Sequence, residues 1–258
     1  MDFIKIAIVG DSISEGLGSK KYNYVNSLKE NLKKAQIESD IKNFAVSGTT
    51  IDYAIDKIEE INRFNPDYLF IFYGNVEAII RPDLRKETII TTLLPKRYHK
   101  MFMLDPRPFF SKNIFKSFIQ HMDNIYRFLM RRVVCKLNGT YRLMEPNEFA
   151  DKYDYFIREM KLHVKNIVCI SNVRIDERYF PGTTLSLDEF RLEIQRISSI
   201  NNTMYVALNE WQKQFLWKCI YGNDHYHPSK DGYEQMGEFF ANQILNKINK
   251  EEKDYARI

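Results

Sequence analysis

Apolar residues along this chain follow two alternating patterns. Short runs that are apolar almost throughout are typical of strands buried on both faces of a parallel sheet. Five such runs occur, at Phe3–Val9, Ile41–Val46, Tyr68–Tyr73, Asn166–Asn172 and Thr203–Leu208. Stretches with helical periodicity separate them, as in Tyr24, Leu28 and Leu32. The alternation predicts a single α/β domain over residues 1–258, with right-handed crossovers and helices on both faces of the sheet.

One long segment interrupts this alternation. Between Pro82 and Leu162 the pattern is helical, and no run reads convincingly as a strand. One helix is marked by Ile114, Phe118, Met122, Ile125, Leu129 and Val133, and a second by Phe149, Tyr153, Phe156 and Met160. We therefore expect a helical insertion after the third strand, at approximately residues 82–162.

Positive charge is concentrated in the same segment. From Arg81 to Arg142 there are 14 Lys and Arg residues against 4 Asp and Glu, a local balance of +10, whereas the whole chain carries +4. A block of one sign attracts anionic partners, although a solvated basic surface without function is the alternative. The run IYRFLMRRVVCKL, residues 125–137, is amphipathic and consistent with peripheral association with a membrane surface.

Several classes of protein do not fit the sequence. No apolar run approaches the roughly 20 residues that span a bilayer, and the acidic start at Asp2 does not match a signal peptide, so we expect a cytoplasmic protein. Three widely spaced cysteines predict reduced thiols, with no disulfide framework and no metal site. The motifs of nucleic-acid-binding folds are missing, and no nucleic-acid partner is predicted.

Small polar residues follow three of the predicted strands, as Gly10-Asp11-Ser12, Ser47-Gly48-Thr49 and Gly74-Asn75. Ligands of open α/β sheets bind beyond the carboxyl ends of the strands. The first loop does not match a Walker loop, because Leu17 follows Gly16 where that loop requires lysine. A dinucleotide fingerprint is absent too, and no cofactor is predicted.

A nucleophilic serine explains the first loop better. The hydroxyl of Ser12 needs a base to accept its proton, and histidine is the usual one. Asp224 and His227 lie three residues apart before the last helix, so the carboxylate can orient the imidazole. Alternatives remain: Ser12 as a helix N-cap, Asp224 as a turn cap, and His225 as the base.

These segments resemble the SGNH (GDSL-type) hydrolases. Gly10-Asp11-Ser12 and Gly48 are similar to the first two sequence blocks of that family, and Asp224-x-x-His227-Pro228, with Gly232-Tyr233 after it, is similar to the last. The resemblance implies a flavodoxin-like three-layer sandwich with a five-stranded parallel sheet. It also implies a cofactor-free serine esterase with Ser12 as nucleophile, His227 as base and Asp224 as its orienting acid. The backbone amides of Ser12 and Gly48 would line the oxyanion hole.

The third block departs from the family pattern Gly-x-Asn-Asp. Alignment on Gly74 puts Val76 at the asparagine position and Glu77 at the aspartate position, whereas alignment on the amide makes Asn75 the third oxyanion donor. We take Asn75 as the candidate donor and keep the other alignment open.

The version aligned on Gly74, with Arg81 downstream, is similar to a branch of SGNH proteins associated with surface polysaccharide gene clusters. This resemblance implies an O-acyl ester of a carbohydrate, most simply an O-acetyl ester, as the substrate. Arg81 and Arg107 are candidate contacts for an anionic substrate group, because the arginine fork suits carboxylates and phosphates. Two alternatives remain open: a polysaccharide O-acetyltransferase using the same triad, and a catalytically weak module that binds anionic glycan.

Overall fold

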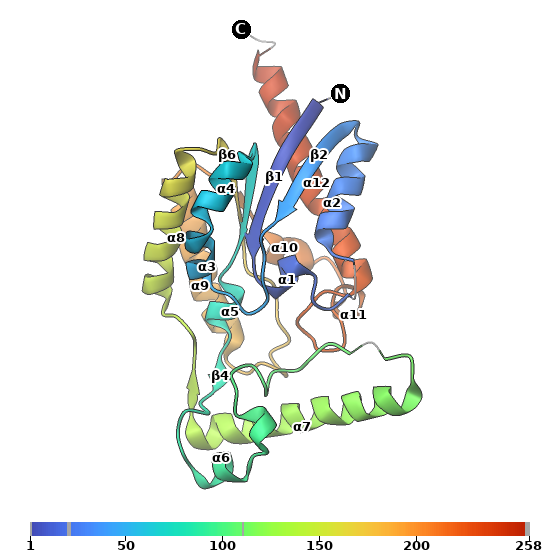
Figure 1. The fold of residues 1–258 in the computed structure, drawn as a ribbon, viewed down its shortest axis with the longest axis vertical. Helices are drawn as coiled ribbons and strands as arrows, with labels where there is room; N and C mark the ends of the chain where they lie inside the picture. Colours follow the sequence, from blue (N-terminus) through green and yellow to red (C-terminus); the bar gives the residue numbers. More distant parts are fainter. Residues whose placement is uncertain (1, 20–21, 110, 256–258) are drawn as a thin grey trace.

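A five-stranded parallel sheet forms the centre of the molecule (Figure 1). The computed structural model describes residues 2–19, 22–109 and 111–255. The strands are β1 (Asp2–Gly10), β2 (Ile37–Asn43), β3 (Tyr68–Phe72), β6 (Asn166–Ile170) and β7 (Met204–Val206), in the spatial order β2-β1-β3-β6-β7. Every residue of β3 and β6 is buried, which accounts for their unbroken apolar character. The order confirms the flavodoxin-like sandwich.

Helices cover both faces of the sheet (Figure 1). One layer holds α2 (Tyr24–Lys34) and α12 (Lys230–Tyr255), which pack against each other. The other layer holds α3 (Ile51–Asp56), α4 (Ile58–Phe64), α8 (Pro146–Lys161) and α9 (Thr183–Ile200). Short helices α1 (Ser12–Glu15), α5 (Asn75–Ala78), α10 (Leu208–Gln212) and α11 (Trp217–Ile220) lie in the connections.

The second strand differs from its prediction. We expected it at Ile41–Val46, but β2 runs from Ile37 to Asn43. It pairs with β1 alone, so it is an edge strand, and its exposed face carries polar residues such as Glu38 and Asp40. These polar positions break the apolar pattern, which explains why the sequence placed the strand too late.

The predicted helical segment at about 82–162 divides into two parts. A separate lobe is closed by an antiparallel pair of short strands, β4 (Arg81–Pro82) and β5 (Thr140–Tyr141), which the sequence did not predict. It contains α6 (Ile89–Leu93), a 3₁₀ turn (Lys96–Tyr98) and the long α7 (Ile114–Asn138). Helix α8 instead packs against α9 and belongs to the sandwich.

Part of the basic block is internal rather than exposed. Arg131 is 1% exposed, where it pairs with Asp105 and donates to the carbonyl of Ile80. Arg127 is also buried and pairs with Asp123 at 2.6 Å. These cations therefore hold the lobe together, and the surface charge is smaller than the sequence count indicates.

No helix within the described ranges is long and apolar enough to cross a membrane.

Candidate active site

Three side chains from opposite ends of the chain form one hydrogen-bonded series. Ser12 Oγ, at the first residue of α1 after β1, lies 2.8 Å from His227 Nε2. His227 Nδ1 lies 2.5 Å from Asp224 Oδ2. Ser12 and His227 are each 6% exposed and Asp224 is fully buried. This is the geometry in which a histidine can take the proton of a serine hydroxyl while a carboxylate fixes its tautomer.

The carboxylate of Asp224 is held for this role by its own turn. Oδ1 accepts hydrogen bonds from the backbone N–H groups of Tyr226 at 3.2 Å and His227 at 3.0 Å. Oδ2 is thereby left for the imidazole. Asp224 thus acts as a turn cap and as a partner of the imidazole at once, so the two interpretations of the sequence are compatible.

The geometry does not support His225 as the base or Ser12 as the N-cap of its helix. His225 lies with Nδ1 3.0 Å from Asp176 Oδ2 and stacks on Tyr179, with ring centroids 3.8 Å apart. The N-cap of α1 is Asp11, whose side chain accepts from the N–H of Ile13 at 3.0 Å. Ser12 is therefore not the cap of its helix, and His227 is the histidine that reaches it.

Packing between α12 and the loop after α1 brings these residues together. Tyr233 Oη donates to the carbonyl of Leu17 at 2.6 Å. Gly18, at φ 108°, lies so close to His227 that an added Cβ would stand 2.6 Å from the Cβ of that histidine. Further along, Ser27 Oγ of α2 donates to the carbonyl of Glu234 at 2.6 Å. These contacts thus hold the loop that follows Ser12 against the loop that carries His227.

Two backbone amides near Ser12 are available to a ligand. The N–H groups of Ser12 and Gly48 have no hydrogen-bond partner among the described residues. Gly48 has φ 77°, a conformation that glycine adopts readily. Its neighbour Ser47 donates its N–H to Glu15 Oε2 at 2.6 Å, and its hydroxyl binds the same oxygen. Glu15 therefore fixes the Gly48 loop to the helix that carries the serine.

A pocket of about 520 Å³ opens at these groups. Its walls include Ser12 and His227, the backbone at Gly48, and apolar side chains such as Val76 and Phe180. Loop residues of the lobe, from Phe102 to Pro108, form another wall. The hydroxyl, the imidazole and a free amide thus face one cavity large enough for a small ester.

Comparison with known proteins identifies the family of this chain. The model of the GDSL-like lipase/acylhydrolase family matches residues 8–235. The chain belongs to this family. No curated protein matches the chain.

Solved structures show the same fold. A lipase/acylhydrolase from Enterococcus faecalis aligns with a TM-score of 0.62 at 16% identity, over 96% of this chain and 97% of that one. The acetylxylan esterase Axe2 from Geobacillus stearothermophilus aligns with a TM-score of 0.58 at 16% identity, over 95% of this chain and 94% of that one. A catalytic mutant of Axe2, with a histidine replaced by alanine, aligns with a TM-score of 0.59 at 15% identity, over 93% and 94%.

In the third block of this GDSL-like chain, the neighbours Asn75 and Val76 lie differently with respect to the pocket. Asn75 is fully buried, its Oδ1 accepts from the N–H of Val173 at 3.0 Å, and it does not line the pocket. Val76, the next residue, does line it. The role of Asn75 as the third oxyanion donor remains a prediction.

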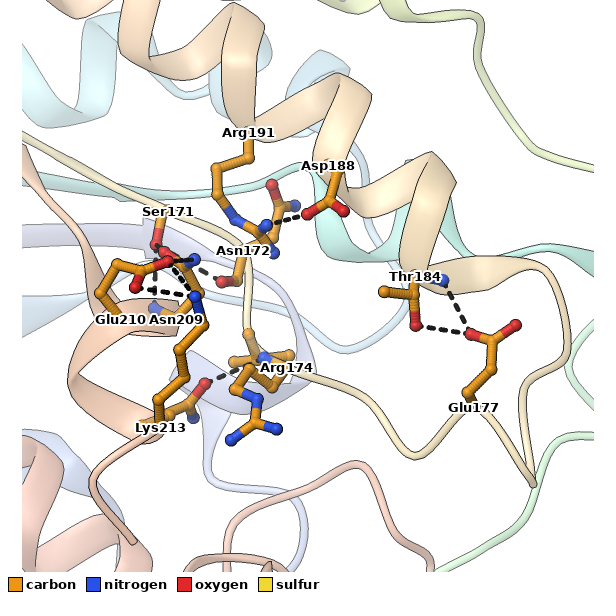
Figure 2. A network of polar contacts seen from close by, with 12 residues as sticks. Ser171, Asn172, Arg174, Glu177, Thr184, Asp188, Arg191, Asn209, Glu210 and Lys213 are labelled. Carbon is orange, nitrogen blue, oxygen red and sulfur yellow. Dashed lines mark hydrogen bonds and ion pairs between the residues drawn. The ribbon is translucent and has the colours of Figure 1, made fainter.

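A polar network fixes the segment that holds Asn75 (Figure 2). Ser171, directly after β6, donates to Asn209 Oδ1 at 2.9 Å. Asn209 Nδ2 donates to Glu210 at 2.8 Å, and Lys213 Nζ donates to the same carboxylate at 2.7 Å. The network joins the end of β6 to α10, and so anchors the connection from which Val173 reaches Asn75.

Two buried carboxyl groups, those of Asp11 and Glu77, lie near the site. Burial raises the pKa of Asp11 to about 6, although the hydrogen bond from Ile13 and the nearby His227 oppose the shift. Burial likewise raises the pKa of Glu77 to about 7. Glu77 accepts from the N–H of Gly74 at 2.9 Å and of Ile51 at 2.8 Å. It therefore joins the loop after β3 to the start of α3.

We predict that Glu77→Gln reduces the pH dependence of stability. The folded-state pKa of Glu77 lies above its ordinary value of 4.5, so the native state binds the proton more tightly and stability falls as pH rises from about 4.5 to about 7. At 1.36 kcal/mol per pKa unit, the loss is on the order of 3 kcal/mol. Urea unfolding of both proteins between pH 5 and pH 8 measures it. The exposed Glu38→Gln is the control, and an unchanged pH dependence in Glu77→Gln would contradict the prediction.

The two candidate arginines occupy different environments. Arg81 is 3% exposed, and its guanidinium donates to the carbonyls of Val76 at 2.8 Å and Ile79 at 3.0 Å and pairs with Asp105 at 3.5 Å. The Arg81 side chain lines the pocket, but its guanidinium already binds these protein groups. Arg107 is exposed at the pocket wall, and no ion pair joins it to any residue that the structure describes.

Two positioning residues were missed by sequence reasoning, Glu15 and Glu77. Neither belongs to a pattern of spaced ligands. Both accept hydrogen bonds from backbone amides, which any residue but proline supplies, and Glu15 also binds the hydroxyl of Ser47. The one signal was that Glu77 occupies the acidic position of the family block when the alignment is made on Gly74.

Proposed function

We propose that this protein is a serine esterase that removes O-acetyl groups from a carbohydrate. The observation that carries the proposal is the series from Ser12 Oγ to His227 Nε2 at 2.8 Å and from His227 Nδ1 to Asp224 Oδ2 at 2.5 Å. The adjoining pocket lies at two backbone amides that have no partner in the part of the chain that the structure describes. Membership of an acylhydrolase family supports the same chemistry.

Acyl transfer to the enzyme is the first half of the proposed reaction. Ser12 Oγ attacks the ester carbonyl while His227 Nε2 accepts the hydroxyl proton, and Asp224 stabilises the imidazolium that forms. Negative charge develops on the carbonyl oxygen, which the N–H groups of Ser12 and Gly48 receive. The imidazolium then gives its proton to the departing sugar oxygen, and the acetyl group remains on Ser12.

Hydrolysis of the acyl-enzyme completes the cycle. Water enters the pocket, loses a proton to His227 Nε2 and attacks the acetyl carbonyl. Collapse of the second tetrahedral intermediate returns the proton to Ser12 Oγ and releases acetate. Because every proton moves through His227, no further acid or base is required.

Two observations favour a carbohydrate acetate as the substrate. One of the structural neighbours is an acetylxylan esterase, and structures of its catalytic mutants replace a serine, an aspartate or a histidine by alanine. In this chain, Arg107 gives the pocket wall an exposed cation, whose guanidinium contacts Met103 Sδ and forms no ion pair among the described residues, and which suits an anionic group on the saccharide.

We expect the protein to release acetate from acetylated oligosaccharides and to react with a fluorophosphonate. A fluorophosphonate bonds covalently to an activated serine, so intact-mass spectrometry should show one adduct on the wild type. Ser12→Ala should show none. Acetate release from acetylated xylo-oligosaccharides and from a simple acetyl ester, each measured by a coupled assay, then reports on the substrate class.

The same measurements separate the alternatives. Acetate release that falls when unacetylated sugars are added, with acetyl sugar formed instead, would identify a transferase. A folded wild type that gives neither adduct nor acetate would identify a binding module, and the esterase proposal would be wrong.

A further inference from the structure

Helix α7 exposes its apolar face. It runs along the end of the molecule opposite the two termini (Figure 1). Six large apolar side chains, spaced three or four residues apart, are between 39% and 82% exposed: Ile114, Phe118, Met122, Ile125, Leu129 and Val133. At 3.6 residues per turn they form one stripe along a helix about 37 Å long. An apolar stripe of this length covers more contiguous surface than the single apolar residues that are scattered over an ordinary protein surface.

The opposite face of α7 fixes this orientation. Arg127 and Arg131 lie there, buried, with Asp123 and Asp105 as their carboxylate partners. Arg127 also donates to the carbonyl of Met103. Turning the helix to bury its stripe would break the pair between Arg131 and Asp105 and the hydrogen bond from Arg127 to Met103, at a high cost for two buried cations. The outward stripe is therefore imposed by the packing of the lobe.

The charged residues near the stripe indicate which kind of surface the stripe binds. Asp123 is the one acidic residue between Pro106 and Met144, and its carboxylate is paired with Arg97 as well as Arg127. Lys112, Lys116 and Lys136 are exposed and form no ion pair within the described ranges.

An apolar stripe with cations and no free acid complements an anionic lipid surface. The apolar side chains enter the boundary between headgroups and acyl chains, and Lys112, just before the helix, and Lys136, on the same face as the stripe, meet the headgroups. A second copy of this chain would instead bring like charges together. We propose that α7 lies flat on bilayers that contain anionic phospholipid and holds the protein there.

The stripe also continues toward the catalytic pocket. Phe118 and Met122 line a groove of about 780 Å³ whose wall includes Arg107 and Pro108. The same two loop residues line the pocket at Ser12. A membrane bound at α7 thus lies on the side of the molecule that carries the pocket wall.

Flotation with vesicles tests the proposal. The wild type should float with phosphatidylcholine vesicles that contain phosphatidylglycerol and should remain behind with phosphatidylcholine alone. Phe118→Ser with Leu129→Ser should weaken binding at least about tenfold, since each side chain loses its transfer from water. Lys112→Gln with Lys136→Gln should weaken it and reduce its dependence on salt.

The control is Leu185→Ser with Leu192→Ser, which removes two exposed leucines from α9 and should leave binding unchanged. Circular dichroism checks that each variant is folded. Ser12→Ala should still bind vesicles, so a failed esterase assay leaves this proposal intact. Absence of wild-type binding to the anionic vesicles would overturn it. So would a wild-type dimer in light scattering that the Phe118 and Leu129 variant converts to monomer, because the stripe would then be a self-association surface.

Discussion

Ser12→Ala, His227→Ala and the double variant are expected to lose nearly the same activity. Each should lower kcat for an acetyl ester by on the order of 10⁶-fold, because hydroxyl and imidazole act as one unit. Asp224→Asn should cost about 10⁴-fold, because an amide in place of the Oδ2 carboxylate favours the wrong tautomer of His227. Steady-state kinetics with an acetyl ester measures all four variants.

His225→Ala is the matched control, in the same loop and two residues from the proposed base. Its ring stacks on Tyr179 and pairs with Asp176, away from Ser12, so kcat should change by less than about tenfold. If the fold-losses in kcat of the two single variants multiplied in the Ser12 and His227 double variant, the two residues would not act as one unit. A loss in His225→Ala as large as that in His227→Ala would reassign the base.

The sequence predicted the residues of the site whose positions depend on local structure. Ser12 lies two residues after the end of β1, and Asp224 and His227 lie within one turn of each other before α12. In a parallel sheet, the end of a strand is also the edge at which ligands bind. Residue spacing together with the resemblance to the SGNH hydrolases therefore predicted which groups meet.

Features that depend on tertiary packing were not predictable in this way. The stripe of α7 has the periodicity of a helix that buries its apolar face, yet Leu129 is 54% exposed while Arg131 is buried. Partners distant in the sequence, such as Asp105 on a loop 26 residues before Arg131, decide which face turns inward. Periodicity locates a helix but does not identify its partner.

The residue of the third block that lines the pocket was also not predictable from the sequence alone. A sequence alignment could place either Asn75 or Val76 in the site, because the two are adjacent. The N–H of Val173 donates to Asn75 Oδ1 at 3.0 Å, and Asn75 does not line the pocket, whereas Val76 does. That contact joins residues 98 positions apart, and no local pattern reports it.

Gly232→Ala is expected to destabilise the protein and displace His227. A Cβ at Gly232 would lie 2.0 Å from the carbonyl oxygen and 2.9 Å from the carbonyl carbon of Ile220, and this backbone cannot rotate away as a side chain could. The same carbonyl accepts the N–H of Ser229 at 2.7 Å, so the catalytic loop is closed at this point. Separation of the two backbones should cost at least about 3 kcal/mol.

Thermal unfolding should show this cost as a Tm lower by roughly 6–12 °C. Activity in the fraction that remains folded should also fall, since the loop that opens carries Asp224 and His227. Gly222→Ala tests the same loop without the clash: its Cβ would meet nothing closer than 3.4 Å, so stability should stay within about 0.5 kcal/mol. Equal Tm values for the two variants would mean that the contact between Gly232 and Ile220 does not hold the loop, and the histidine would have to be positioned by Gly18 and Tyr233 alone.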